Sequence, residues 1–125
     1  MKVRIAGNKI RFRLKEPEVQ QFRLEGSISA KLEFGFADTD QLTFTLSAYQ
    51  QEDFSIQFAS GHVTLFVPRL LADKWTSTEE VGFESAVDTG KGKVVNILVE
   101  KDFVCMDGRE EDNIGSYPNP LANLP

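Results

Sequence analysis

The sequence predicts a mainly β protein of the α+β class, with two β-β-α-β-β units packed as a pseudo-twofold barrel or as a two-layer sandwich. The first observation is an internal duplication, because residues 2–14 align with residues 55–67 at a shift of 53 positions. The second is that apolar residues occupy every second position in both stretches, which is typical of strands with one buried face. The third is the placement of Gly and Pro where these runs end. We therefore expect one domain, 1–125, made of repeat 1 (1–50), repeat 2 (54–103) and an irregular acidic, Pro-rich tail (104–125).

The first unit opens with a predicted hairpin. Gly7-Asn8 supplies a tight turn, and the flanking strands carry Val3 and Ile5, then Ile10, Phe12 and Leu14, on one face. Pro17 fits a first helical turn, and the helix that follows is expected to end at Gly26. Two further strands complete the unit, with alternating apolar residues over 28–34 and 42–46.

The second unit repeats this order. A hairpin turns at Ser60-Gly61, and Pro68 ends its second strand and opens a helix that runs through Trp75. Strands over 81–87 and 95–99 follow, joined by a Gly-rich turn. Because a four-stranded unit has one apolar face and nothing to cover it, we expect the two units to bury these faces against each other.

Length and composition limit the class of protein. The chain has 125 residues, 41% hydrophobic and 26% charged, which is ordinary for one globular domain and argues against wholesale disorder. Its apolar runs are far too short to cross a bilayer, so no membrane contact is expected. The opening Met1-Lys2-Val3-Arg4 contains no signal-peptide core, and the single cysteine, Cys105, cannot form an internal disulfide. These features indicate a cytoplasmic protein.

One resemblance concerns the arrangement of the second unit. Its turn, strand, proline, helix and strand carry Gly61, Val63, Leu65, Val67, Pro68, Leu71, Trp75, Phe83 and Glu84. This order resembles the swapped-hairpin fold of AbrB-like transcription factors, and two such units in one chain are similar to the MraZ arrangement. The resemblance implies DNA binding, and it carries no functional residue over to this chain.

A second resemblance covers nearly the whole chain. It rests on residues 2–11, residues 99–103, Cys105 and residues 117–120. In these stretches the chain resembles a set of small uncharacterised bacterial proteins. This resemblance implies a bacterial cytoplasmic protein and attaches no activity to it.

The charge pattern gives the main candidate site. If the apolar residues of the first hairpin face inward, six basic side chains project to the other side: Lys2, Arg4, Lys9, Arg11, Arg13 and Lys15. Their counterparts in the second unit carry no fixed charge, and like charges on neighbouring strands repel. Acidic groups should therefore cover this anion-binding or tail-docking face. They come either from within the chain (Glu16, Glu18, Glu33 or the acidic stretch 107–112) or from an external anionic partner.

Other candidates have ordinary structural explanations. A Cys105/His62 dyad would be needed for nucleophilic catalysis, but a single cysteine is usually a buried thiol and His62 falls in a predicted turn. The acidic residues of 107–112 lack the spacing of a calcium loop. Trp75 and Phe22 occupy matching places at the helix ends and are expected in the core. No catalytic, cofactor-binding or metal-binding residue is assigned, and no cofactor is expected.

The sequence therefore predicts a small soluble binding or interaction module of unknown role, with no catalytic activity expected. Its partner would be a protein or a second copy of the chain. The alternative is a tandem AbrB-like nucleic-acid-binding regulator that uses the basic first hairpin. A sequence pI near 4.9 argues against strong phosphate binding.

Overall fold

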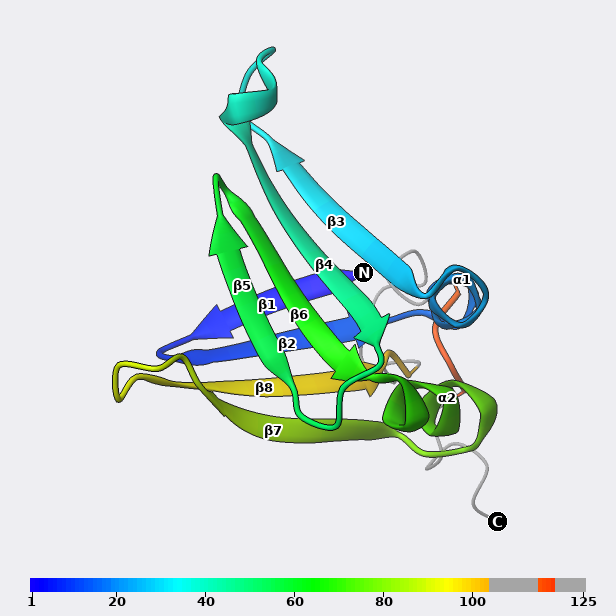
Figure 1. The fold of residues 1–125 in the computed structure, drawn as a ribbon. Coiled ribbons are helices and arrows are strands. Elements are labelled where there is room, and N and C mark those ends of the chain that lie inside the picture. Colours follow the sequence, from blue (N-terminus) through cyan, green and yellow to red (C-terminus); the bar gives the residue numbers. More distant parts are fainter. Residues whose placement is uncertain (104–114, 119–125) are drawn as a thin grey trace.

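A computed structural model describes residues 1–103 and 115–118 of the chain (Figure 1). The elements, in chain order, are β1 (Lys2–Ala6), β2 (Lys9–Leu14), α1 (Glu16–Glu25), β3 (Ser27–Glu33), a 3₁₀ turn (Asp38–Asp40), β4 (Gln41–Tyr49), β5 (Ser55–Ala59), β6 (His62–Pro68), α2 (Arg69–Ser77), β7 (Gly82–Asp88) and β8 (Val94–Lys101). The predicted strands and helices are thus all present. No helix in these described stretches is long and apolar enough to cross a membrane.

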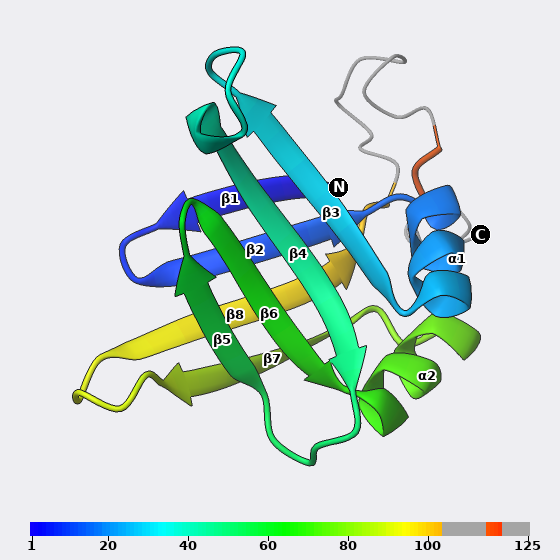
Figure 2. The same cartoon turned by 45° about the horizontal axis from the view of Figure 1, so that its top comes forward.

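The strands form two four-stranded sheets, and each sheet takes one hairpin from each half of the chain (Figure 2). The first has the order β1-β2-β8-β7 and the second the order β3-β4-β6-β5. Their central pairs, β2 with β8 and β4 with β6, are parallel, whereas the hairpins are antiparallel. The expectation that each half forms its own sheet, with the two halves packed face to face, is therefore wrong.

The predicted barrel is also wrong, because the two sheets do not close on each other. Closure would require β1 to pair with β3, or β5 with β7, but each of these described strands pairs with a single neighbour. The parallel pairs lie at the centre of each sheet and leave these four strands at the edges. In Figure 1 the strands of the two sheets cross at an angle and diverge away from the helices.

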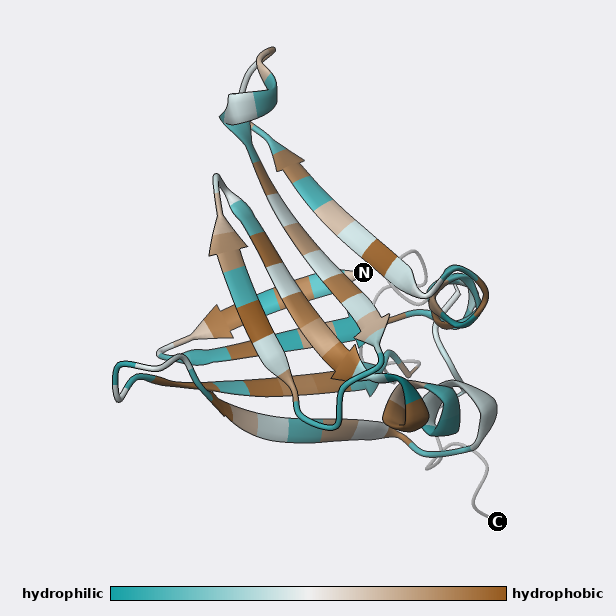
Figure 3. Cartoon of the chain, in the orientation of Figure 1, coloured by the Kyte–Doolittle hydropathy of each residue, from teal (hydrophilic) through white to brown (hydrophobic). Residues whose placement is uncertain are grey.

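One core lies between the two sheets and under the helices. Apolar residues alternate along the strands (Figure 3), and the inward positions include Phe12 of the first sheet and Leu65 of the second, both buried. Trp75 of α2 is completely buried, and its ring lies edge-on to Phe22 of α1 and to Phe83 of β7. The two helices therefore cover the same end of the core. The predicted burial of Phe22 and Trp75 is confirmed.

Local residue choices set where these elements begin and end. Gly26 has a φ of 78°, and its N–H donates to the Phe22 carbonyl, so α1 ends at the predicted glycine. Ser60 and Gly61 have φ values of 50° and 74°, which is the left-handed pair that a two-residue hairpin turn requires. The turn between β1 and β2 is at Gly7-Asn8, where Gly7 has a φ of 57°, and its register puts the basic residues of both strands on one face.

Candidate functional site: a charged sheet face

The six basic candidates belong to the first hairpin or follow it directly, and the strand register shows which face of the sheet they occupy. Lys2 lies opposite Arg13 and Arg4 opposite Arg11 across β1 and β2, on the face turned away from the core. On its other side β2 pairs with β8, which places Arg13 beside Glu100 and Lys9 beside Asn96. The outer face of the first sheet is therefore basic along β1 and β2, with a carboxylate on β8.

Glu100 is the centre of the ion pairs on this face. The Nε atoms of Arg11 and Arg13 donate to the same oxygen, Oε1, at 2.7 Å and 2.6 Å. The Glu100 side chain is only 14% exposed. Burial by itself would raise the pKa of Glu100, but the hydrogen bonds from Arg13 and Arg11 outweigh burial and lower it. Glu100 thus stays ionised and holds two like-charged arginines side by side.

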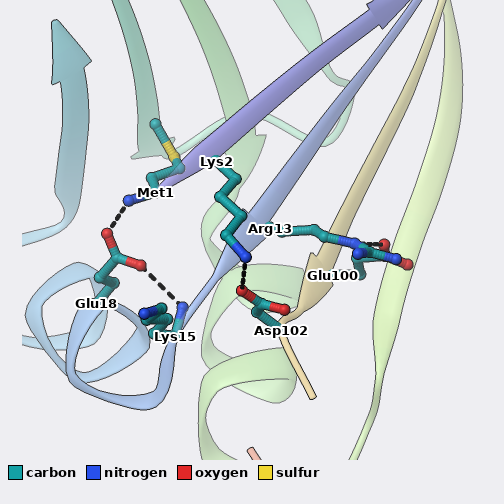
Figure 4. Close-up of polar contacts among 7 residues, drawn as sticks. All are labelled: Met1, Lys2, Arg13, Lys15, Glu18, Glu100 and Asp102. Atoms are coloured by element: carbon teal, nitrogen blue, oxygen red, sulfur yellow. Dashed lines mark hydrogen bonds and ion pairs between the residues drawn. The ribbon is translucent and has the colours of Figure 1, made fainter. Parts of the chain in front are cut away.

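A second carboxylate, Asp102, lies where β8 ends. Its Oδ2 lies 3.1 Å from the Lys2 ammonium, and the Asp102 side chain is only 6% exposed (Figure 4). The backbone holds Asp102 from two sides, because its N–H donates to the Leu14 carbonyl and its carbonyl accepts from the Tyr117 N–H. Asp102 therefore links the basic hairpin to residues 115–118.

A third carboxylate, Glu18, holds the beginning of the chain. One of its oxygens pairs with the Met1 amino group, and the other accepts the Lys15 backbone N–H at 2.9 Å, as Figure 4 shows. Burial lowers the pKa of the Met1 amino group, and the nearby Lys15 charge lowers it further. Glu18 thus fixes the two ends of the first hairpin on the first turn of α1.

Arg4 and Lys9 differ from the other members of the face. Both side chains are exposed, and no carboxylate within residues 1–103 and 115–118 lies within 4 Å of either. A hollow of about 460 Å³ is lined by Lys9 together with Glu84, Ala86 and Asn96. The face therefore combines arginines fixed by Glu100 with two basic groups that point into solvent.

Lys101 and Tyr117 form a polar group behind this face, at the helix end of the core. The Lys101 ammonium donates to the Thr78 carbonyl at 2.7 Å and lies over the rings of Trp75 and Tyr117, 5.8 Å and 5.5 Å from their centres. Burial lowers the pKa of Lys101. Burial, with a contribution from Glu16, raises the pKa of Tyr117 to about 12. These groups fasten residues 115–118 to the domain.

The expected acidic cover stays a prediction for the stretch 107–112, which lies outside the described residues. Glu18 pairs with the chain terminus, but within the described residues no ion pair joins Glu16 or Glu33 to the basic hairpin. The carboxylates that sequence reasoning missed are Glu100 and Asp102. Alternation along residues 94–101 places Glu100 outward, but nothing in that pattern indicates that β8 lies beside β2.

The remaining candidates lie partly outside the described residues, so the structure tests only His62 among them. His62 begins β6 instead of lying in a turn, and its Nε2 is 2.8 Å from Thr45 Oγ1, which lies 2.6 Å from Ser29 Oγ. Cys105 and the acidic stretch 107–112 lie outside the described residues. No cluster of three or more His, Cys, Asp and Glu residues suited to a metal ion occurs in the part of the chain that the structure describes.

Comparison with family models identifies the family of the chain. The model of DUF7009, a family of unknown function, matches residues 1–121, so the chain belongs to this family. No curated protein and no solved structure matches the chain. The expected membership of a family without an assigned activity is confirmed, whereas the resemblance to AbrB-like factors and MraZ is not. Nothing in the comparisons indicates catalysis or nucleic-acid binding.

Proposed function

We propose that this protein is a non-catalytic binding module that works in the cytoplasm. Its site is the outer face of the first sheet, built on Lys2, Arg4, Lys9, Arg11, Arg13 and Lys15. The observation that carries the proposal is the exposure of Arg4 and Lys9 beside arginines that Glu100 already holds in place. Ordered arginines on a paired sheet lose little side-chain freedom when a ligand binds.

The chemistry of the face favours a carboxylate-rich protein segment as the ligand. Guanidinium groups bind carboxylates through paired, charge-assisted hydrogen bonds. The acidic groups Glu84 and Asp88 lie on β7 at the other side of the same sheet, so the basic part is a narrow strip along β1 and β2. A narrow strip suits a short acidic segment better than a long phosphate backbone, because a long polyanion would extend beyond the strip onto the carboxylates of β7.

The acidic stretch 107–112 of the chain is one segment of this kind. Its position relative to the face stays a prediction, because it lies outside the described residues. The described parts of the chain before and after it support the proposal: Asp102 pairs with Lys2, and the Gly115 carbonyl accepts the Glu16 N–H next to Lys15. Both contacts lie at the edge of the basic face.

We also propose that residues 1–50 and 54–103 are copies of one β-β-α-β-β unit. The same order of elements occurs in both halves. The parallel pairing of β2 with β8 has its counterpart in the pairing of β4 with β6. The hairpin of β1 and β2 corresponds to the hairpin of β5 and β6, and only the first of these two hairpins carries the basic residues.

A binding measurement tests the proposed site. A fluorescent poly-glutamate peptide is titrated with the wild type and with Arg4→Gln/Lys9→Gln, and its anisotropy is recorded. The double variant loses the two ion pairs that Arg4 and Lys9 would form with peptide carboxylates, and this should weaken binding about tenfold. Raising the ionic strength should weaken the binding of the wild type as well. Lys91→Gln/Lys93→Gln removes the same charge from the exposed turn after β7 and is the matched control.

Three outcomes decide the matter. Equal affinity for the wild type and Arg4→Gln/Lys9→Gln contradicts the proposed face. Tighter binding to a single-stranded DNA of equal charge than to the peptide favours a nucleic-acid ligand instead. Tighter peptide binding after the acids of 107–112 are replaced by their amides (Asp107→Asn, Glu110→Gln, Glu111→Gln and Asp112→Asn) shows that this stretch competes for the face.

A further inference from the structure

The free edge of β3 lies on the second sheet, away from the charged face. The Phe34 N–H donates to the Asp40 carbonyl and the Ala48 N–H donates to the Gly26 carbonyl. In an antiparallel pair, hydrogen-bonded positions alternate, so the even-numbered residues of β3 bond to β4 and the peptide groups of the odd-numbered ones point outward. Among the described strands, β3 pairs with β4 alone. The peptide groups of Ser27, Ser29, Lys31 and Glu33 are thus oriented to receive another strand.

The end of β3 nearest the 3₁₀ turn has apolar side chains on the face turned toward the core. The core does not bury these side chains. Ile28 is buried, but Leu32 is 55% exposed and Phe34 is 72% exposed. In Figure 1 the β3–β4 hairpin extends beyond the other strands, which explains why these side chains lack neighbours there. An exposed edge with large apolar side chains is a template for pairing with another strand.

Charge protects most such edges, but here the charges complement each other. Lys31 and Glu33 lie two residues apart on the outer face of β3. An antiparallel copy of β3, with the twofold axis at Leu32, places Lys31 of each copy opposite Glu33 of the other. The same register places Leu32 against Leu32 and Phe34 against Ala30.

The neighbouring registers are less favourable. A twofold axis at Lys31 would set the two lysines directly opposite each other, which repels. An axis at Ala30 would leave Lys31 and Glu33 opposite serines and would leave Phe34 opposite Gly26. In the register centred on Leu32, the outward peptide groups of Lys31 and Glu33 form the hydrogen-bonded pair.

We propose that β3 is a self-association edge, which pairs antiparallel with β3 of a second copy in the register centred on Leu32. The pairing joins two four-stranded sheets into one continuous sheet. It covers Leu32 and Phe34, and it leaves the charged face of the first sheet free in both copies. This proposal does not depend on what the charged face binds.

Charge reversal tests the register directly. Lys31→Glu alone and Glu33→Lys alone each place like charges opposite one another twice in a homodimer, and each should raise the dimer dissociation constant about tenfold or more. The double variant Lys31→Glu/Glu33→Lys restores both opposite pairs and should dimerise like the wild type. Mixing the two single variants should give a heterodimer. Lys91→Glu, in an exposed turn, is the control for net charge.

Sedimentation velocity over a wide concentration range reads out the association of each variant, and far-UV circular dichroism checks that each is folded. Recovery of dimer in the double variant and in the mixture supports the proposed edge. A wild type that stays monomeric at every concentration overturns it. Single variants that dimerise as strongly as the wild type also overturn it, because association would then use another surface.

Discussion

Replacement of Glu100 by Gln should destabilise the fold, because Glu100 holds Arg11 and Arg13 on the charged face. The substitution keeps the size of the side chain but removes the charge that two guanidiniums share at 2.7 Å and 2.6 Å. A charge-assisted hydrogen bond in a dry site is worth about 1.5–3 kcal/mol, whereas exposed ion pairs are worth only about 0.2–1 kcal/mol. Since both arginines are partly exposed, we expect a loss of about 1–2 kcal/mol in the free energy of unfolding at pH 7.

The loss should depend on pH in one direction. The folded pKa of Glu100 is lowered, so the folded state binds its proton less readily than the unfolded chain does. The stabilisation is therefore fully present above the ordinary glutamate pKa, about 4.3, and disappears as the pH falls through the lower folded value. The difference between the wild type and Glu100→Gln should shrink accordingly in acid.

Urea unfolding followed by the fluorescence of Trp75, the only tryptophan, measures this difference. Glu84→Gln, on the same face of the neighbouring strand β7, is the matched control and should change the free energy of unfolding by less than about 0.5 kcal/mol. If Glu100→Gln costs no more than Glu84→Gln at pH 7, or costs the same at acid and neutral pH, Glu100 does not hold the arginines as we describe.

Two further predictions concern the turns and residues 115–118. Gly61→Ala should cost about 1–3 kcal/mol of unfolding free energy, because Gly61 has a φ of 74° and an added Cβ would lie 2.7 Å from the Gln41 carbonyl oxygen. Gly92→Ala, with a φ of 71° and no atom within 4 Å of the added Cβ, should cost less in the same urea titration, and equal costs would contradict the contact. The raised pKa of Tyr117, about 12, stabilises the fold below the ordinary tyrosine pKa, and this contribution is lost as the pH rises to about 12. Tyr117→Phe should therefore flatten part of the alkaline loss of stability and remove one phenol titrating near pH 12 from the absorbance curve; loss of a phenol that titrates at the ordinary tyrosine pKa, about 10, would instead place Tyr117 in solvent.

The elements were largely predictable because local residue choices set them. Gly7, Gly26, Ser60-Gly61 and Pro68 mark turns and ends by the backbone angles they permit, and these are visible in sequence. Alternation likewise identified the inward residues of each strand, from Phe12 to Leu65.

The pairing between strands was not predictable in the same way. The apolar pattern of β8 indicates which of its residues face the core. This pattern would be the same whichever strand lay next to β8. Pairing of β2 with β8 joins residues about ninety positions apart, so the meeting of Arg13 with Glu100 appears only in the folded chain. The barrel was wrong for a related reason, since alternation cannot show whether the edges of two sheets meet.

The central claim is that the basic face of β1 and β2 is a binding surface, and NMR mapping tests it most directly. An acidic peptide is added to the ¹⁵N-labelled protein, and changes in backbone amide shifts are followed residue by residue. We predict the largest changes at Arg4, Lys9 and Arg11, with little change along β3. Changes concentrated elsewhere, or no saturable change, would contradict the claim.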